Sequence, residues 1–406
     1  MSLIKPSDPV TLAGAVVDSL VLAADPQSRE ASIFYWDRGQ QHLRAVVQAA
    51  REYPDPDIVT LAERLMADTR DPAAYLALHG ALVRIVTADP ARGAAPLFAR
   101  AWAVETNCRL GVHLGAGYSA DPGVAPVGVE TLRRLPAGAG RPDGPAEVLV
   151  VVPFRDQTAD RGRLRNLLAC LMALRDQSAP RESYCVTVVE SDEVPRWREV
   201  IEPYTDNYIF AQKGGLFAKS WAVNVGVVNS PGDAEVICVL DADVLADRDF
   251  IVRNAVRFQQ AGTMGHLSYR DMWCLDEAST AYAVEARLRR READVDPAAL
   301  RAFVLRRPPG CCVWVRTSAY HRIGGMDERF EGWGGEDNDF AYRMDINSAF
   351  DNYADPLLHM YHPSTSALRQ DGELINAHIP ALSWRPGQQI GDVHRFARRA
   401  GTPASV

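Results

Sequence analysis

The spacing of apolar residues changes near residue 145, and this change limits how the chain can fold more than any other feature. Before it, apolar residues recur at helical spacing, and after it short apolar runs alternate with helical stretches. Strands that alternate with helices are typical of an α/β domain with a mostly parallel sheet, since parallel strands need crossover connections. The sequence therefore predicts a small helical domain with its linker over residues 1–140 and an α/β domain over residues 146–406.

Three apolar stripes support the helical assignment of the first 110 residues or so. The third stripe follows Asp71, which is suited to cap a helix, and Pro72, which is suited to its first turn. Such stripes usually pack into a core, so this region is expected to form a small bundle that is suited to cover an acceptor cleft or to form a homodimer. The stripes are Leu43, Val46, Val47 and Ala50; Ile58, Leu61 and Leu65; and Tyr75, Leu78, Leu82, Ile85 and Val86.

The segment between Val112 and Pro145 is rich in glycine, proline and alanine, which is typical of an exposed connector. Within it, Gly115, Gly117 and Ala120 imitate a dinucleotide-binding loop. We reject that interpretation because no strand of the right kind is expected before them and no helix after them.

The second half contains a βαβ unit, with a strand at Val148–Val152, a helix at Arg163–Leu174 and a strand at Tyr184–Val189. Further strands are expected at Val236–Leu240 and Cys311–Val315. In sheets of this kind ligands bind beyond the carboxyl ends of the strands, so polar residues at those ends are the first candidates for a site.

Composition excludes several classes of protein. The 406 residues carry a formal net charge of -8, which disfavours a nucleic-acid partner because such proteins show a basic excess. No run reaches the ~18 apolar residues that a membrane span needs. The seven cysteines form no CxxC or Cys/His cluster, so we expect reduced, buried thiols, no structural zinc and a cytoplasmic location.

Asp241 and Asp243 follow the apolar run EVICVL directly. Two carboxylates one residue apart at a strand end can turn toward one hard divalent cation, which then neutralises a diphosphate. Acidic triplets are also common on solvated loops, but the strand terminus is where a metal–diphosphate site is required. The triplet therefore predicts a metal site.

A second cluster is the loop from Gly332 to Asp337, which runs into an apparent helix. Its glycines, Gly334 and Gly335 among them, let a substrate approach the backbone closely, and Glu336 and Asp337 lie at the helix start. We expect Asp337 to act as a general base and Glu336 to hold the acceptor. The alternative is that this acidic pair only caps the helix.

A third cluster is His359 and His362, at the end of another apolar run. A neutral imidazole beside two carboxylates gives a ligand set suited to manganese. One histidine is enough, and His359 is favoured because it follows the expected strand more directly. The choice between the two stays open.

Four blocks share an order and spacing: VVPFRDQ at 151–157, FAKSWAVNVGV at 217–227, VLDADV at 239–244 and RIGGMDERFEGWGGEDNDFAYRM at 322–344. Between residues 148 and about 365 the chain resembles the β-1,4-galactosyltransferases and related GT-A-fold glycosyltransferases, including bacterial chondroitin-type polymerases. The GWGGED block is the most specific, followed by the PFR and DxD motifs.

The resemblance implies a Rossmann-like nucleotide-diphospho-sugar transferase domain and an inverting transfer from a nucleotide-sugar, with a UDP-sugar as the expected donor. The acceptor is then a carbohydrate or other glycan hydroxyl, and the cofactor is Mn²⁺, with Mg²⁺ as the alternative. The residues implied are Pro153, Phe154 and Arg155 for the nucleotide, Asp192 for the nucleoside, Lys219, Asn224 and Gly310 for donor or acceptor, Asp241 and Asp243 for the metal, Trp333 for donor and acceptor, Glu336 for the acceptor and Asp337 as base.

Two other functions are carried forward. One is a catalytically silent sugar-binding or scaffold protein of the same fold, against which the intact carboxylates argue. The other is a nucleotidylyltransferase or a metal-dependent nucleotide-sugar hydrolase, in which the GWGGED loop has no role. The charged segment 281–307 is expected to be helical, either as an acceptor-site insertion or as a solvated helix face.

Overall fold

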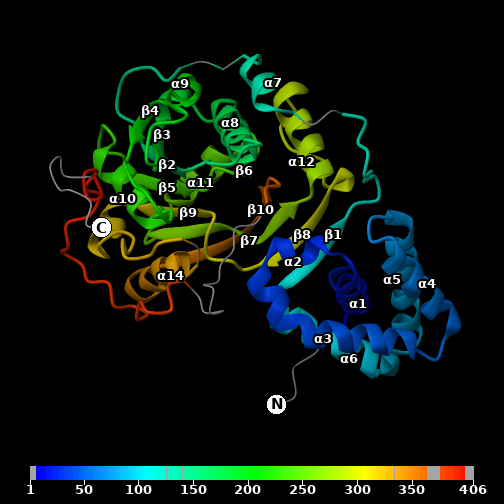
Figure 1. The fold of residues 1–406 in the computed structure, drawn as a ribbon. Coiled ribbons are helices and arrows are strands. Elements are labelled where there is room, and N and C mark those ends of the chain that lie inside the picture. The colour runs from blue at the N-terminus through cyan, green and yellow to red at the C-terminus, as the bar shows by residue number, and fades with distance from the viewer. Residues whose placement is uncertain are drawn as a thin grey trace, which may run out of the picture.

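The computed structural model describes residues 6–124, 127–136, 138, 140–332, 334–363 and 375–397. A mixed sheet lies at the centre with helices on both faces, and a group of N-terminal helices packs against one end of it (Figure 1). The strand order is β1-β8-β7-β9-β5-β2-β3-β4, and β10 joins β7 and β6. The predicted α/β class is therefore confirmed.

The strands of the sheet are β1 (Leu110–Leu114), β2 (Val148–Phe154), β3 (Tyr184–Glu190), β4 (Asn207–Phe210), β5 (Val236–Leu240), β6 (Val244–Leu245), β7 (Gly265–Leu275), β8 (Arg301–Arg306), β9 (Cys312–Arg316) and β10 (Phe350–His359). The α-helices are α1 (Pro9–Ala24), α2 (Gln27–Ala31), α3 (Ile33–Arg51), α4 (Pro56–Ala67), α5 (Pro72–Ala88), α6 (Pro96–Cys108), α7 (Val129–Arg133), α8 (Gly162–Arg175), α9 (Arg198–Ile201), α10 (Lys219–Asn229), α11 (Phe250–Arg257), α12 (Glu277–Val284), α13 (Thr317–Arg322) and α14 (Glu336–Asn347).

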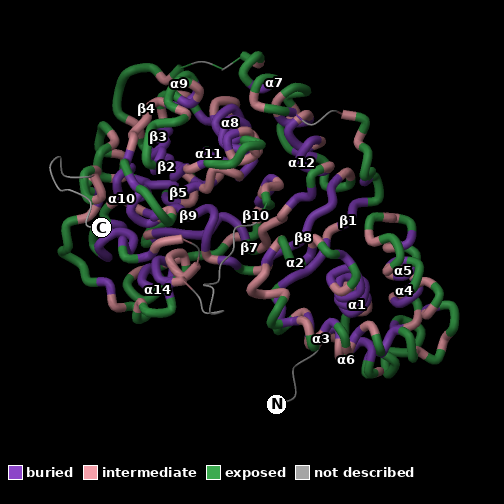
Figure 2. The backbone as a smooth tube through the Cα atoms, in the orientation of Figure 1, coloured by how far each residue is buried: buried purple, intermediate pink, exposed green. Residues whose placement is uncertain are grey.

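The N-terminal helices form where the apolar stripes predicted them, as α3, α4 and α5. Asp71 caps α5, because its side chain accepts a hydrogen bond from the backbone N–H of Ala73 at 2.8 Å. The helices bury their stripes in a core that also contains Phe303 and Leu305 of β8. The helical region and one end of the sheet thus share a single core, seen as the buried inner faces in Figure 2.

The block β5-β2-β3-β4 of the sheet is parallel throughout, and its strands confirm the predicted βαβ unit. Alternate residues of β2 point to opposite faces. Val150 packs with α8 on one face, and Val151 packs with Trp221 of α10 on the other. Because both faces are covered, the strands are mostly apolar, and apart from Thr187 in the middle of β3 their polar residues lie at the ends.

Two expectations for the chain between the predicted strands were wrong. Residues 110–114, at the start of the predicted connector, form strand β1, which pairs antiparallel with β8. β8 itself lies within the segment 281–307 that was expected to be helical. Apolar positions on both faces of β8 are buried, so packing between β1 and β7 outweighs the helix propensity of its neighbours.

The arginines of that segment are not a solvated helix face. Arg287 is buried and donates hydrogen bonds to the Asp176 side chain and to backbone carbonyls. Arg301 is also buried and pairs with Asp25 and Asp276. The expectation of a solvated helix face is therefore wrong at Arg287 and Arg301.

Gly115 follows strand β1 directly, so a strand does precede the rejected dinucleotide-like loop. It is an antiparallel edge strand, and no helix begins among residues 116–124. Gly115 serves packing instead, because a Cβ there would lie 2.2 Å from the carbonyl oxygen of Ala298.

Every one of the seven cysteines is free of a disulfide, and six are buried, as predicted. Within the part of the chain that the structure describes, no helix is both long enough and apolar enough to cross a membrane.

Candidate active site

Polar side chains from four elements meet at the carboxyl end of β5. Asp241 and Asp243 follow this strand, Lys219 begins α10, Asp337 lies in the first turn of α14, and His359 ends β10. These residues are far apart in the sequence, and the sheet brings them to one edge. This is where the strand pattern predicted a ligand site.

Lys219 lies between the two carboxylates that the sequence placed in different motifs. Its Nζ is 2.8 Å from Asp241 Oδ1 and 3.1 Å from Asp337 Oδ1. Burial works against the charge of the lysine, but Asp241 and Asp337 raise the pKa of Lys219 well above its usual value. The ammonium group therefore joins the metal triplet to the predicted base.

Burial also acts on the carboxylates of this cluster. It raises the pKa of Asp241 to about 6, although Lys219 opposes the change. Burial and the neighbouring Asp337 charge raise the pKa of Glu336 to about 7. The Oε2 atom of Glu336 is buried and has no hydrogen-bond partner among the described residues. The cluster thus carries more negative charge than the protein itself neutralises.

Asp243 faces both histidines, one with each oxygen. His362 Nε2 is 2.9 Å from Oδ2, and His359 Nε2 is 3.2 Å from Oδ1. Burial works to raise the pKa of Asp243, but the two histidines hold it well below its usual range.

The pKa values of the two histidines are shifted in opposite directions. Burial lowers the pKa of His359. In spite of burial, the hydrogen bond to Asp243 raises the pKa of His362. Asp243 Oδ1 is buried and has no hydrogen-bond donor among the described residues, although His359 is close to it. A carboxylate oxygen and an imidazole nitrogen that face each other without a hydrogen bond fit a bound cation.

Cysteine was not among the ligands that the sequence pointed to, but the structure adds one. Ligand atoms of Asp243, Cys311 and His359 all lie within 4.8 Å of one another. Burial, followed by the charge of Asp241, raises the pKa of the Cys311 thiol well above its usual value. The sequence signal available for it was its place at the start of a strand next to Gly310.

Gly310 lies against the predicted base. A Cβ at this position would be 2.0 Å from Asp337 Oδ2, so the carboxylate occupies the space that a side chain would need. The carbonyl oxygen of Gly310 accepts hydrogen bonds from the Tyr269 hydroxyl and from the Cys312 N–H. Gly310 therefore helps to fix where Asp337 lies.

The glycine-rich loop has the backbone freedom that its composition predicted. Gly334 and Gly335 have φ angles of +100° and +101°, a region that L-residues with side chains rarely adopt. Gly335 is the N-cap residue of α14, and no side chain caps this helix by a hydrogen bond. Glu336 and Asp337 both lie in the first turn of the helix, so the alternative that this pair only serves the helix end stays open. Trp333 lies outside the described residues.

Three other predicted site residues, Arg155, Asp192 and Asn224, form hydrogen bonds outside the carboxylate cluster. The guanidinium of Arg155 donates to backbone carbonyls of Ser191, Lys213 and Gly215. It thereby holds together the loops that follow β3 and β4.

Asp192 accepts hydrogen bonds from Gln157 at 2.7 Å and from Arg196 at 2.9 Å. Asn224 is buried, and its amide bonds to the backbone of Met326, to Glu328 and to the hydroxyl of Tyr320. Pro153 and Phe154 are buried in β2.

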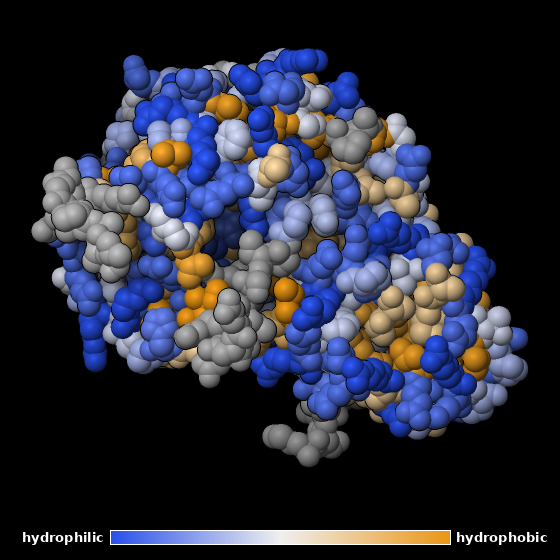
Figure 3. Space-filling view, viewed as in Figure 1, coloured by the Kyte–Doolittle hydropathy of each residue, from blue (hydrophilic) through white to orange (hydrophobic). Residues whose placement is uncertain are grey.

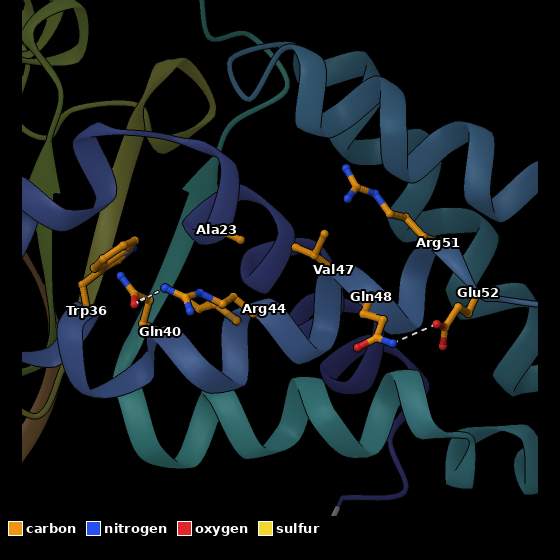
Figure 4. Close-up of a pocket in the computed structure, with 9 residues that line it drawn as sticks. Ala23, Trp36, Gln40, Arg44, Val47, Gln48, Arg51 and Glu52 are labelled. Carbon is orange, nitrogen blue, oxygen red and sulfur yellow. Dashed lines mark hydrogen bonds between the residues drawn. The ribbon is translucent and has the colours of Figure 1, made fainter.

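A larger cavity lies elsewhere, in the helical region (Figure 4). It has a volume of ≈ 580 Å³ and is lined mainly by α3, with Trp36, Arg44 and Arg51 among its residues. The void beside Lys219, Cys311 and Asp337 is only ≈ 10 Å³. The chemistry of the carboxylate cluster, rather than cavity size, marks the candidate site.

Hydrophilic residues cover most of the face drawn in Figure 3.

A family model described as the N-terminal domain of galactosyltransferase matches residues 305–354. That range holds Gly310, Cys311, the glycine loop and α14. It supports a relationship to glycosyltransferases for this part of the chain. No curated protein matches the chain in sequence.

Solved glycosyltransferases show distant likeness. The mannosyltransferase PcManGT from Pyrobaculum calidifontis, in complex with GDP-Man and Mn²⁺, is 17% identical and covers 60% of this chain and 64% of its own, with a TM-score of 0.33. S. aureus TarS 1-349 is 14% identical and covers 53% and 60%, with a TM-score of 0.37. The catalytic domain of Drosophila β1,4-galactosyltransferase 7, in complex with xylobiose, is 15% identical and covers 64% and 82%, with a TM-score of 0.30. The chain spans less than two thirds of the first two structures.

Proposed function

We propose that the protein is a GT-A-type glycosyltransferase that depends on a divalent cation and transfers a sugar from a nucleotide-sugar to an acceptor hydroxyl with inversion. One observation carries the proposal. The Asp241/Asp243 triplet and the Glu336/Asp337 pair, predicted from separate motifs, meet around Lys219 at one sheet edge. A metal–diphosphate site beside a base is what sugar transfer needs.

In this mechanism Asp337 takes the proton of the acceptor hydroxyl as its oxygen attacks the anomeric carbon. The bond to the nucleoside diphosphate breaks on the opposite face of the sugar, and the diphosphate leaves with the bonding electrons. Lys219, 2.8 Å from Asp241, is placed to balance that charge. Asp243, His359 and His362 would hold a divalent cation, which supplies further neutralisation of the diphosphate. Glu336 would hold the acceptor.

The raised pKa of Glu336, about 7, suits that role. A protonated carboxyl donates one hydrogen bond, and an ionised carboxylate accepts several. Near neutral pH Glu336 can therefore either donate a hydrogen bond to a sugar hydroxyl or accept one from it. We further propose that residues 146–406 carry the chemistry and that residues 1–140 support the end of the sheet where β1 and β8 pair.

A donor screen tests the proposal. UDP-, GDP- and dTDP-sugars are compared by thermal shift with Mn²⁺ and with chelator, because a ligand of the native state raises its apparent stability. UDP-sugars are the expected donors, and GDP-sugars belong in the panel because PcManGT is described with GDP-Man. We expect at least one donor to stabilise the protein only when the cation is present.

The products then separate the alternatives. Donor consumption with formation of a glycoside of inverted configuration supports the proposal. Release of free sugar as the sole product, in the presence of varied acceptors, would instead favour a nucleotide-sugar hydrolase. A donor that binds and stays intact with and without Mn²⁺ would favour a binding protein.

A further inference from the structure

Cys311 has an unusual backbone for a residue with a side chain. Its φ angle is 71°, in the left-handed region that favours glycine. The other non-glycine residues with positive φ in the described chain are exposed, whereas Cys311 is buried. Left-handed backbone costs a residue with a Cβ about 1–2 kcal/mol. A glycine would adopt this backbone freely, so the thiol at this position calls for a local reason.

The surroundings of the thiol supply that reason. Its sulfur lies within 4.8 Å of a carboxylate oxygen of Asp243 and a ring nitrogen of His359. The backbone fixes the approach, because the carbonyl oxygen of Cys311 accepts a hydrogen bond from Asp241 N–H at 2.8 Å. The left-handed turn and this bond together hold the sulfur beside the metal triplet.

A second observation points to a ligand at the same place. Asp243 Oδ1 is buried without a hydrogen-bond partner among the described residues, and it faces His359 Nε2 at 3.2 Å. The three groups therefore present one oxygen, one nitrogen and one sulfur toward a common point. That set differs from the oxygen-rich sites that Mg²⁺ and Mn²⁺ prefer, because thiolate sulfur selects softer cations.

We propose that Cys311 is a ligand of the cation held by Asp243 and His359, so that the site binds a thiophilic cation such as Zn²⁺ or Co²⁺ more tightly than Mn²⁺ or Mg²⁺. On binding, the thiol releases its proton to solvent and the thiolate forms the bond to the cation. The inference deepens the cation site of the proposed function, but it concerns metal binding alone and is tested without sugar transfer.

Cobalt titration of the metal-free, full-length protein tests it. A sulfur-to-cobalt charge-transfer band in the near ultraviolet appears only when a thiolate binds Co²⁺. We expect this band in the unaltered protein and its loss in both Cys311→Ser and Cys311→Gly. The glycine variant suits the left-handed backbone, so it keeps the test valid if serine disturbs the turn.

Affinity gives a second readout. In competition with a chelating dye, the Cys311 variants should bind Zn²⁺ on the order of 100-fold more weakly, with Mn²⁺ binding little changed. Cys185→Ser is the matched control, because Cys185 is a buried thiol of β3 whose sulfur contacts Asn207 instead. It should keep the band and the affinity.

A spectrum without the band in the unaltered protein, or an equal band in the Cys311 variants, would overturn the assignment. These outcomes are independent of catalysis. A band that depends on Cys311 in a protein that transfers no sugar would support the ligand and reject the proposed function. Sugar transfer by a protein without the band would support the proposed function and reject Cys311 as a ligand.

Discussion

Two regions of this protein bury charged side chains, and they treat them in opposite ways. Where the N-terminal helices meet the sheet, buried Arg301 pairs with Asp25 and Asp276. Hydroxyl groups complete the network, since Thr69 donates to Asp25 and Tyr118 donates to Asp276, each at 2.7 Å. The protein itself satisfies these carboxylates.

At the carboxyl end of β5 the network is left open. Asp243 Oδ1 and Glu336 Oε2 are buried without hydrogen-bond partners among the described residues, and Lys219 is shared by two carboxylates. A buried carboxylate oxygen without a partner destabilises a fold unless a ligand completes it. The difference between the two networks lies in their carboxylates, because Arg301 Nε of the first network also has no partner among the described residues. Under the proposed function, a cation and a substrate complete the open carboxylates.

The sharpest test of the contrast is Asp337→Asn. If the open network exists for catalysis, turnover should fall by about two to four orders of magnitude, the range that loss of a general base costs. Donor affinity and the free energy of unfolding should change little. Asp345→Asn is the control, because it makes the same change at an exposed position of α14. Retained turnover in Asp337→Asn would end the assignment of the base.

The closed network is broken by Arg301→Ala. This change leaves Asp25 and Asp276 buried without their cation and should lower the free energy of unfolding by about 3–5 kcal/mol, as measured by urea denaturation. Arg289→Ala removes an exposed arginine that pairs with Glu285 at 3.0 Å, and it should cost less than about 1 kcal/mol. Equal losses in the two variants would contradict the structural role of Arg301.

Asp243→Asn should separate the two regions by their response to metal. In the unaltered protein a cation at about 100 times its dissociation constant adds about 2.7 kcal/mol of stability. The variant should lose this increment, and without metal it should also be less stable, because Asp243 loses its charge beside His362, whose Nε2 is 2.9 Å from Oδ2. Asp233→Asn, at an exposed position before β5, should keep the increment. If metal stabilised Asp243→Asn as much as the unaltered protein, Asp243 would not be a ligand of the cation.

The smallest effect concerns Glu105 in α6, which is 2.9 Å from Arg306 of β8. Burial raises the pKa of Glu105 from 4.5 to about 7, although Arg306 opposes the change. The folded state therefore holds this proton more tightly than the unfolded state, and stability contributed by the neutral form falls as pH rises from about 4.5 to 7. Glu105→Gln should flatten this decline, on the order of 1 kcal/mol, in denaturation curves taken across that range. An unchanged slope would show that Glu105 is not its source.

Local signals predicted most of the parallel core. The sequence predicted β2, β3 and β5 from their apolar runs and the start of α5 from its Asp71 cap. Each of these signals depends on residues that are neighbours in sequence. β1 and β8 were not visible, because Leu110 pairs with Leu305 and each strand is stabilised by a partner almost two hundred residues away. Helix-favouring alanine, glutamate and arginine residues before β8 also gave the wrong local signal.

The candidate site divides in the same way. Position at a strand end identified Asp241 and Asp243, and the glycine loop identified Glu336 and Asp337. Sequence could not show that Lys219 contacts both groups, because that contact joins two motifs through the folded sheet. Nor could it show that the side-chain amide of Asn224 donates hydrogen bonds to Met326 and Glu328, since the type of a polar residue does not show which partner it binds.

Under the proposed function, Gly310 limits how the acceptor preference of this protein could be redesigned. Position 310 faces the site and invites randomisation, yet the first carbon of any side chain there would meet the Asp337 carboxylate at 2.0 Å. A combinatorial library that includes this codon would lose activity in nearly all its members, whatever its other substitutions offer. Position 310 is best left fixed, and diversity placed at codons whose side chains do not press on the base.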